Sequence, residues 1–97
     1  MATTPEGKIK EKVKRLFKKH DVYYHMPVQN GMGKMTLDFV ACLRGWFIAV
    51  ETKAEGKKPT ARQQITMAEM RAAGAFVFVV SCEAELRWLE CYLEILP

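Results

Sequence analysis

Two runs of strand-forming residues, 36–43 and 46–53, are separated only by Arg44-Gly45. A two-residue link that ends in glycine, placed between two such runs, is typical of a tight antiparallel hairpin. This hairpin constrains the fold more than any other feature of the sequence, because the length of the link also sets the register of the two strands. We therefore predict that the two residues flanking the link face each other.

The predicted register brings charged residues of the two strands together. Counting outward from the link, Asp38 lies directly opposite Glu51. Lys53 shares the face of Glu51, because residues two apart on a strand point the same way. Two facing carboxylates destabilise a strand pair unless a cation compensates them. Two carboxylates and a backbone carbonyl, for which Thr52 is placed, suit an oxygen-seeking ion such as Mg²⁺ or Mn²⁺. The alternative is an exposed sheet face without a metal.

The rest of the chain supplies helices and strands around this hairpin. Helices are predicted over 6–20, 60–73 and 83–95, and further strands over 22–28 and 75–81. Pro27 favours an edge position for the first of these strands, whereas the apolar composition of the second favours an interior position. A helical crossover precedes the last strand and favours parallel pairing. The expected fold class is α/β, with the order α-β-β-β-α-β-α and a mixed sheet flanked by helices, in a single domain over residues 1–97.

Charge is unevenly distributed along the sequence. The first 62 residues contain 13 basic and 6 acidic side chains, whereas the rest contain 2 basic and 5 acidic ones. Basic residues gathered in one part of a chain are typical of a polyanion-binding surface, although a solvated lysine-rich helix has the same pattern. The candidate DNA contacts are Lys8, Lys12, Lys19, Lys57 and Lys58.

The sequence shows no sign of a membrane anchor or a secretory leader. Its longest nearly pure apolar run, 72–80, is about half the roughly 20 residues of a membrane-spanning helix, and its N-terminus lacks the apolar core of a signal peptide. Three widely spaced cysteines, Cys42, Cys82 and Cys91, form no disulfide pattern, and we interpret them as buried small residues. We expect a soluble protein in a reducing, cytoplasmic compartment.

The hairpin residues resemble a known motif. Leu37-Asp38, followed after twelve residues by Glu51-Thr52-Lys53, is similar to the signature of the PD-(D/E)XK nucleases. An ordered series of blocks extends the match over 33–40, 44–45, 50–54, 56–63 and 73–75. This series resembles the VRR-NUC family, in particular its short standalone members from phages and prophages. Leu37 departs from the proline that is usual at its position.

The resemblance implies a restriction-endonuclease-like core and a metal-dependent, structure-selective endodeoxyribonuclease acting on branched DNA such as a four-way junction. Such a protein would work in the cytoplasm of a bacterial host if a phage encodes it. By the resemblance, Asp38, Glu51 and the Thr52 carbonyl would bind Mg²⁺ or Mn²⁺, and Lys53 would be the catalytic lysine. The alternative function is a non-catalytic nucleic-acid-binding module of the same fold.

Two further residues are implied to complete the active site. Gln63 would support it, although the stretch that begins at Thr60 also has the pattern of a capping box that serves only the helix. A glutamate of the first helix often takes part, for which Glu6 is the candidate and Glu11 the alternative. Glu6 also suits the first turn of any helix, and Glu11 is spaced to pair with Arg15.

The last predicted helix has two adjacent apolar stripes. One consists of Leu86, Leu89, Leu93 and Leu96, and the other of Trp88, Tyr92 and Ile95. A helix that is apolar over so wide an arc has more than one face to bury. This favours a homodimer with isologous packing, and the alternative is that Trp88 and Tyr92 pack within the monomer.

Overall fold

The computed structural model describes residues 4–28, 31 and 33–97. Its elements are α1 (Pro5–Lys19), β1 (Tyr23–His25), β2 (Phe39–Leu43), β3 (Trp46–Thr52), α2 (Ala61–Ala72), β4 (Phe76–Val80) and α3 (Glu83–Ile95). The predicted α-β-β-β-α-β-α order is therefore confirmed. The sheet order is β1-β2-β3-β4, in which the first two pairs are antiparallel and the pair β3–β4 is parallel, as the helical crossover predicted.

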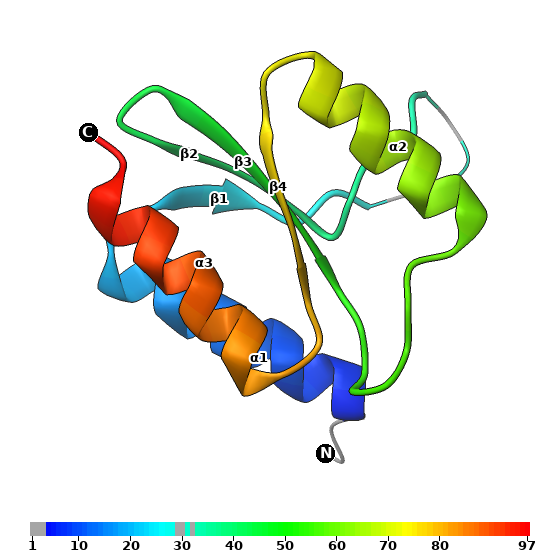
Figure 1. Ribbon diagram of the computed structural model, residues 1–97, viewed down its shortest axis with the longest axis horizontal. Coiled ribbons are helices and arrows are strands. Elements are labelled where there is room, and N and C mark those ends of the chain that lie inside the picture. The colour runs from blue at the N-terminus through cyan, green and yellow to red at the C-terminus, as the bar shows by residue number, and fades with distance from the viewer. Residues whose placement is uncertain (1–3, 29–30, 32) are drawn as a thin grey trace.

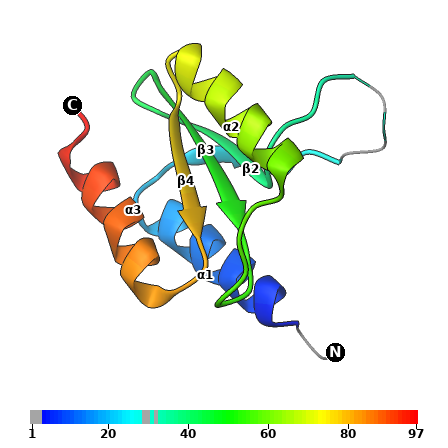
Figure 2. The ribbon, with the colours of Figure 1, turned by 45° about the vertical axis from the view of Figure 1, so that its right-hand side comes forward.

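Helices cover both faces of the mixed sheet (Figures 1 and 2). On one face α1 and α3 lie side by side and contact each other, and α2 lies on the opposite face. The larger hydrophobic core, which includes Phe17 and Phe39, lies between the sheet and the pair α1–α3. A smaller cluster, which includes Leu37 and Met67, lies beneath α2. The three-layer arrangement thus gives each face of the sheet its own apolar cover.

β3 directs alternate side chains to these two faces. Ile48 and Val50 enter the α1–α3 core, and Ala49 enters the cluster beneath α2. By the same alternation, Glu51 and Lys53 belong to the α2 side. The polar end of β3 therefore lies beside the beginning of α2.

The tight hairpin between β2 and β3 is confirmed. Both residues of the link have positive φ angles, 49° at Arg44 and 89° at Gly45, as a primed two-residue turn requires. Facing pairs run from Leu43–Trp46 to Phe39–Val50, which is the predicted register. β2 begins at Phe39, so the ladder is shorter than the predicted strand over 36–43.

Arg44 adopts a backbone conformation that is uncommon for a long side chain. Its guanidinium donates hydrogen bonds to the carbonyl oxygens of Leu93, at 3.4 Å, and of Leu96. Carbonyls at a helix C-terminus lack partners within the helix and carry the negative end of its dipole. Arg44 thus connects the hairpin turn to the end of α3.

β4 lies at an edge of the sheet, so its predicted interior position is wrong. Both α2 and α3 pack on this strand, which explains its apolar composition, because both of its faces are covered although one backbone edge is open. Arg71 of α2 donates a hydrogen bond of 3.4 Å to the carbonyl of Val77 on this strand. Charged residues along an edge strand limit pairing with further strands. At the opposite edge lies β1, as Pro27 predicted.

The predicted burial of the three cysteines is wrong for two of them. Cys42 and Cys91 are exposed, Cys82 is partly buried, and all three are free thiols. Cys42 is exposed because its neighbours Ala41 and Leu43 occupy the core-facing positions of β2. None of the described helices is long and apolar enough to cross a membrane.

Candidate active site

Asp38 lies immediately before β2 and is held by the end of β3. Its Oδ2 atom accepts hydrogen bonds from the backbone N–H of Thr52, at 2.9 Å, and from the Thr52 hydroxyl, at 2.7 Å. Thr52 is fully buried, and so is Leu37, which packs in the cluster beneath α2. The residue before Asp38 and the residue that binds its carboxylate are therefore both fixed by the core.

Glu51 is a buried carboxylate next to Asp38. Only 3% of its surface is exposed, and its Oε2 atom accepts a hydrogen bond of 2.9 Å from Gln63 Nε2. Lys53 Nζ lies 3.7 Å from the same oxygen. Burial raises the pKa of Glu51 to about 7, with a further contribution from the charge of Asp38, although Lys53 and a hydrogen bond from the Asp38 backbone act in the opposite direction. The negative charge of Glu51 is thus only partly compensated.

Gln63 serves both the helix and Glu51. The predicted capping box at the start of α2 is confirmed, because Gln63 N donates to Thr60 Oγ1 at 3.1 Å and Thr60 N donates to Gln63 Oε1 at 2.9 Å. The amide nitrogen of the same side chain donates to Glu51. The two interpretations of Gln63 are therefore compatible, since its amide oxygen binds the helix end and its amide nitrogen binds the carboxylate.

Comparisons with known proteins bear on the fold that carries these residues. No family model and no curated protein matches the sequence. A solved structure described as a VRR_NUC domain is similar to this chain, with a TM-score of 0.78 and 29% sequence identity. The match covers 91% of this chain and 95% of that chain.

The chain thus resembles a VRR_NUC domain in its fold. The resemblance expected from the hairpin motif is therefore confirmed, and the chain has a nuclease-type fold. In this chain, Asp38, Glu51 and Lys53 gather where β2 begins and β3 ends. Crevices at the carboxyl ends of strands are common positions for ligand sites in α/β proteins.

Helix α1 adds a glutamate and a lysine to this region. Lys10 Nζ lies 3.4 Å from Glu6 Oε2 and 3.9 Å from Asp38 Oδ1. The charge of Glu6 also contributes to the raised pKa of Glu51. Lys10 was not predicted as a site residue, although its spacing of four residues from Glu6 places the two side chains on the same face of the helix.

Glu11, the alternative to Glu6, lies on another part of α1. It forms an ion pair of 3.2 Å with Lys14, rather than the predicted pair with Arg15. Both side chains of the pair are well exposed. Of the two candidate glutamates, only Glu6 has a described contact with a residue that also reaches Asp38.

The donor atoms present fit a hard divalent cation. Within the described part of the chain, no group of three or more His, Cys, Asp or Glu side chains could hold a metal ion. Two carboxylates, Asp38 and Glu51, are available, and the Thr52 carbonyl lies on the same strand edge as the Thr52 N–H that binds Asp38. Carboxylate and carbonyl oxygens with water in the remaining positions suit Mg²⁺ or Mn²⁺. The partly compensated charge of Glu51 also favours a bound cation.

Two of the five candidate DNA-contacting lysines are paired with α3. Lys12 pairs with Glu83, and Lys19 Nζ lies 2.8 Å from Glu90 Oε2. These ion pairs hold the two lysines against the acidic side of the neighbouring helix. The charges of these two lysines are therefore already paired within the chain.

The other three candidate lysines are exposed. Lys57 and Lys58 lie in the loop between β3 and α2, shortly after Lys53, and Lys8 lies on α1. Among the residues that the structure describes, no salt bridge involves any of these three. Their charges are thus available to a polyanion.

Proposed function

We propose that this chain is a metal-dependent, structure-selective endodeoxyribonuclease that hydrolyses phosphodiesters of branched DNA, such as a four-way junction. The convergence of Asp38, Glu51 and Lys53 at the end of β3 carries the proposal. A buried carboxylate with a strongly raised pKa is typical of functional sites. Burying its charge lowers the stability of the fold, so such a group is usually retained for a function. The alternative, a non-catalytic nucleic-acid-binding module, gives no reason to bury Glu51 beside a second carboxylate.

Each residue of the proposed site has a distinct task. A divalent ion held by Asp38, Glu51 and the Thr52 carbonyl would polarise a phosphate oxygen and lower the pKa of a bound water. Lys53 provides a positive charge beside Glu51, where it can stabilise the charge that develops on the phosphate. Gln63 fixes the orientation of Glu51 through its amide nitrogen.

Thr52 and Glu6 complete the proposed site. The Thr52 N–H and hydroxyl hold Asp38 Oδ2, so this carboxylate does not rotate freely. Glu6 brings a third negative charge to the region from the α1 side. We assign Glu6 rather than Glu11 to this role because its partner Lys10 also reaches Asp38, whereas Glu11 has a described ion pair only with Lys14.

The proposed DNA-binding surface runs from α1 to the loop after β3. Lys57 and Lys58 are its strongest candidates, because they are exposed and follow the proposed catalytic Lys53 in the chain. Lys8 adds a third exposed charge. DNA contacts by Lys12 and Lys19 would require each lysine to exchange an α3 glutamate for a phosphate.

Cleavage of a panel of DNA substrates tests the proposed function. Linear, flapped and four-way duplexes are incubated with Mg²⁺, with Mn²⁺ and with EDTA. We expect cleavage of the branched substrates with either metal and none with EDTA. Binding of the same substrates without cleavage under any of these conditions would instead support the non-catalytic module.

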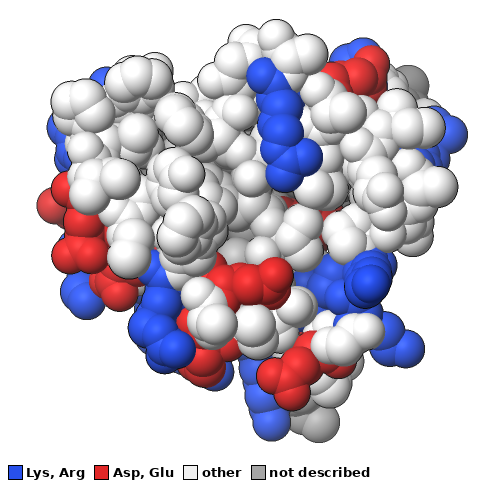
Figure 3. All heavy atoms as spheres, viewed as in Figure 1, with Lys and Arg blue, Asp and Glu red and all other residues white. Residues whose placement is uncertain are grey.

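We further propose that the chain acts as a homodimer through the surface formed by β4 and α3. Trp88 and Ile95 of α3 are 60% and 71% exposed. Figure 3 shows a broad, mostly uncharged area on the side of the molecule where α3, β4 and α2 face the viewer, interrupted by one basic side chain in its upper part and with many charges along its lower margin. At a two-fold axis each charge approaches its own copy, so an uncharged surface is suited to isologous pairing with a second copy of this chain.

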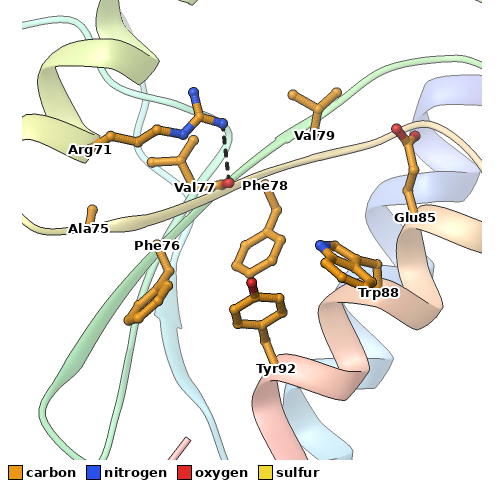
Figure 4. Close-up of a pocket in the computed structure, with 9 residues that line it drawn as sticks. All are labelled: Arg71, Ala75, Phe76, Val77, Phe78, Val79, Glu85, Trp88 and Tyr92. Carbon is orange, nitrogen blue, oxygen red and sulfur yellow. Dashed lines mark hydrogen bonds between the residues drawn. The ribbon is translucent and has the colours of Figure 1, made fainter. Parts of the chain in front are cut away.

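A groove of about 450 Å³ follows β4 on this surface. Aromatic rings of β4 and α3 face each other across it, as Figure 4 shows for Phe78, Trp88 and Tyr92. The ring of Tyr92 lies 5.1 Å from that of Phe78 and 5.5 Å from that of Trp88. Tyr92 thus packs within the monomer, whereas most of Trp88 is left for a partner.

The dimer is tested by light scattering. We expect a mass near twice 11.1 kDa, and Trp88→Glu should shift it toward the monomer. Tyr23→Glu is the matched control, because Tyr23 is an 80% exposed aromatic residue on the opposite edge strand. A parent protein that is monomeric at micromolar concentration would contradict this part of the proposal.

A further inference from the structure

Lys10 occupies a particular position relative to the two oxygens of Asp38. The Oδ2 atom is bound by Thr52 through two hydrogen bonds, whereas Lys10 Nζ lies 3.9 Å from Oδ1. Oδ1 is thus the oxygen that remains for a cation, and a lysine ammonium already lies beside it. Glu6, one helical turn before Lys10, lies 3.4 Å from the same ammonium.

We propose that Lys10 is a built-in counter-ion of Asp38, which a divalent cation displaces and which thereby sets the metal concentration at which the site loads. This inference rests on the proposed function, because it concerns the metal that the proposed nuclease uses. It assigns a regulatory role to a residue outside the expected set of ligands and catalytic groups.

The contact between Lys10 and Asp38 is suited to displacement. A separation of 3.9 Å is too long for a hydrogen bond, and 31% of the Lys10 side chain and 20% of the Asp38 side chain are exposed. Ion pairs with this much access to water are weak. By contrast, only 15% of the Lys53 side chain and 4% of the Glu51 side chain are exposed, so that pair is much less accessible.

Glu6 gives the displaced lysine a second partner. A divalent cation at Asp38 Oδ1 would repel an ammonium group only a few ångströms away. Lys10 can turn toward Glu6 on its own helix, with which it already shares an ion pair. The lysine therefore leaves Asp38 without losing all of its electrostatic compensation.

The chain offers a matched control for this proposal. Lys14 lies one turn further along α1 and pairs with a glutamate of the same helix, Glu11, as Lys10 does with Glu6. Lys14 has no described contact with Asp38. Substitutions of Lys10 and Lys14 therefore change the net charge of the helix equally but differ in their effect on Asp38.

Calorimetric titration of the DNA-free protein with MnCl₂ tests the inference. Lys10→Met should bind Mn²⁺ about threefold more tightly than the parent, because Mn²⁺ no longer has to displace the Lys10 ammonium from Asp38. The factor corresponds to the energy of an exposed ion pair. Lys14→Met should bind it like the parent. Lys10→Arg, which keeps the charge, should also bind it like the parent.

Thermal unfolding without metal supplies a second readout. Lys10→Met should lower the melting temperature more than Lys14→Met, because Asp38 as well as a glutamate of α1 loses a neighbouring cation. Equal Mn²⁺ affinities of Lys10→Met and Lys14→Met would overturn the role of Lys10 and leave the proposed nuclease function intact. A parent protein that neither binds Mn²⁺ nor cleaves DNA would overturn the proposed function and this inference together.

Discussion

At the turn of the β2–β3 hairpin, the positive charge of Arg44 meets carbonyl oxygens of α3, whereas at the open end of the same hairpin the negative charge of Glu51 is buried beside Asp38. At the turn, Arg44 has a backbone conformation that is uncommon for arginine, and its side chain donates hydrogen bonds to the end of α3. At the open end, burial raises the pKa of Glu51, and the like charge of Asp38 raises it further. Because folding alone gives no advantage to such a pair, the contrast supports the proposal that the open end of the hairpin is the active site, whereas the contacts of the turn stabilise the fold.

The largest expected effect is the loss of cleavage from substitutions at the open end. Asp38→Ala, Glu51→Ala and Lys53→Ala should each reduce the cleavage rate by at least about a thousandfold, which corresponds to about 4 kcal/mol of transition-state stabilisation. Circular dichroism should show that all three retain the fold. Lys18→Ala, at the exposed far end of α1, is the control and should cleave like the parent. Full activity in any one of the three site variants would refute the site as described.

The next effect is a change in the pH dependence of stability. The pKa of Glu51 is about 7 in the folded protein against an ordinary value of 4.5, so between these pH values the folded state binds more protons than the unfolded state. The free energy of unfolding of the metal-free protein should therefore fall as the pH rises from 4.5 through 7. At pH 8 the loss should approach about 3 kcal/mol.

Glu51→Gln should remove this pH dependence, because the substituted side chain carries no charge. Urea denaturation should show the variant to be more stable than the parent at pH 8 and similar to it near pH 4. Glu55→Gln is the matched control, since Glu55 is an exposed glutamate of the loop that follows β3. If the pH profiles of Glu51→Gln and the parent run parallel, the charge of Glu51 is compensated in a way that the described contacts do not include.

The sequence predicted the register of the β2–β3 hairpin better than the contacts that other residues make with Asp38. A two-residue link leaves few possible registers, so counting from Arg44-Gly45 located the strand pairs and brought Asp38 close to Glu51. The counting did not show that Asp38 leaves the ladder, because that depends on hydrogen bonds from Thr52. Lys10 was missed for a related reason, since the approach of α1 to Asp38 is a tertiary contact without a sequence signal of its own.

The strand β4 illustrates the opposite failure. Its apolar sequence predicted correctly that neither face is fully exposed, but it predicted the position in the sheet wrongly, because the helices on the two faces bury Phe78 and Val80 and partly cover the other residues. Likewise, the capping-box pattern predicted the backbone contacts of Gln63 but left its free amide nitrogen unassigned. Sequence patterns report local geometry and burial, whereas the residues that meet in a site depend on how distant elements pack.

At the hairpin turn, a moderate effect on stability without an effect on chemistry is expected. Arg44→Ala should lower the free energy of unfolding by about 1–2 kcal/mol, because it removes charge-assisted hydrogen bonds to the end of α3. The cleavage rate per folded molecule should not change. Arg87→Ala, an exposed position on α3, is the control and should leave stability within about 0.5 kcal/mol of the parent. A loss of cleavage in Arg44→Ala without a loss of stability would contradict the proposal that the turn of the hairpin affects only stability.

The smallest expected change in stability comes from substitution of Gln63, which both caps α2 and contacts Glu51 in the proposed active site. Gln63→Ala should lower the free energy of unfolding by about 1 kcal/mol, because the side chain no longer caps α2, and it should also slow cleavage. Gln63→Glu can still accept the Thr60 N–H, since glutamate also forms capping boxes, but it offers no donor to Glu51. Denaturation at pH 5 should therefore show a smaller loss of stability for Gln63→Glu than for Gln63→Ala, while both variants cleave slowly. If Gln63→Glu cleaved like the parent, the contact with Glu51 would be incidental and Gln63 would serve only the helix.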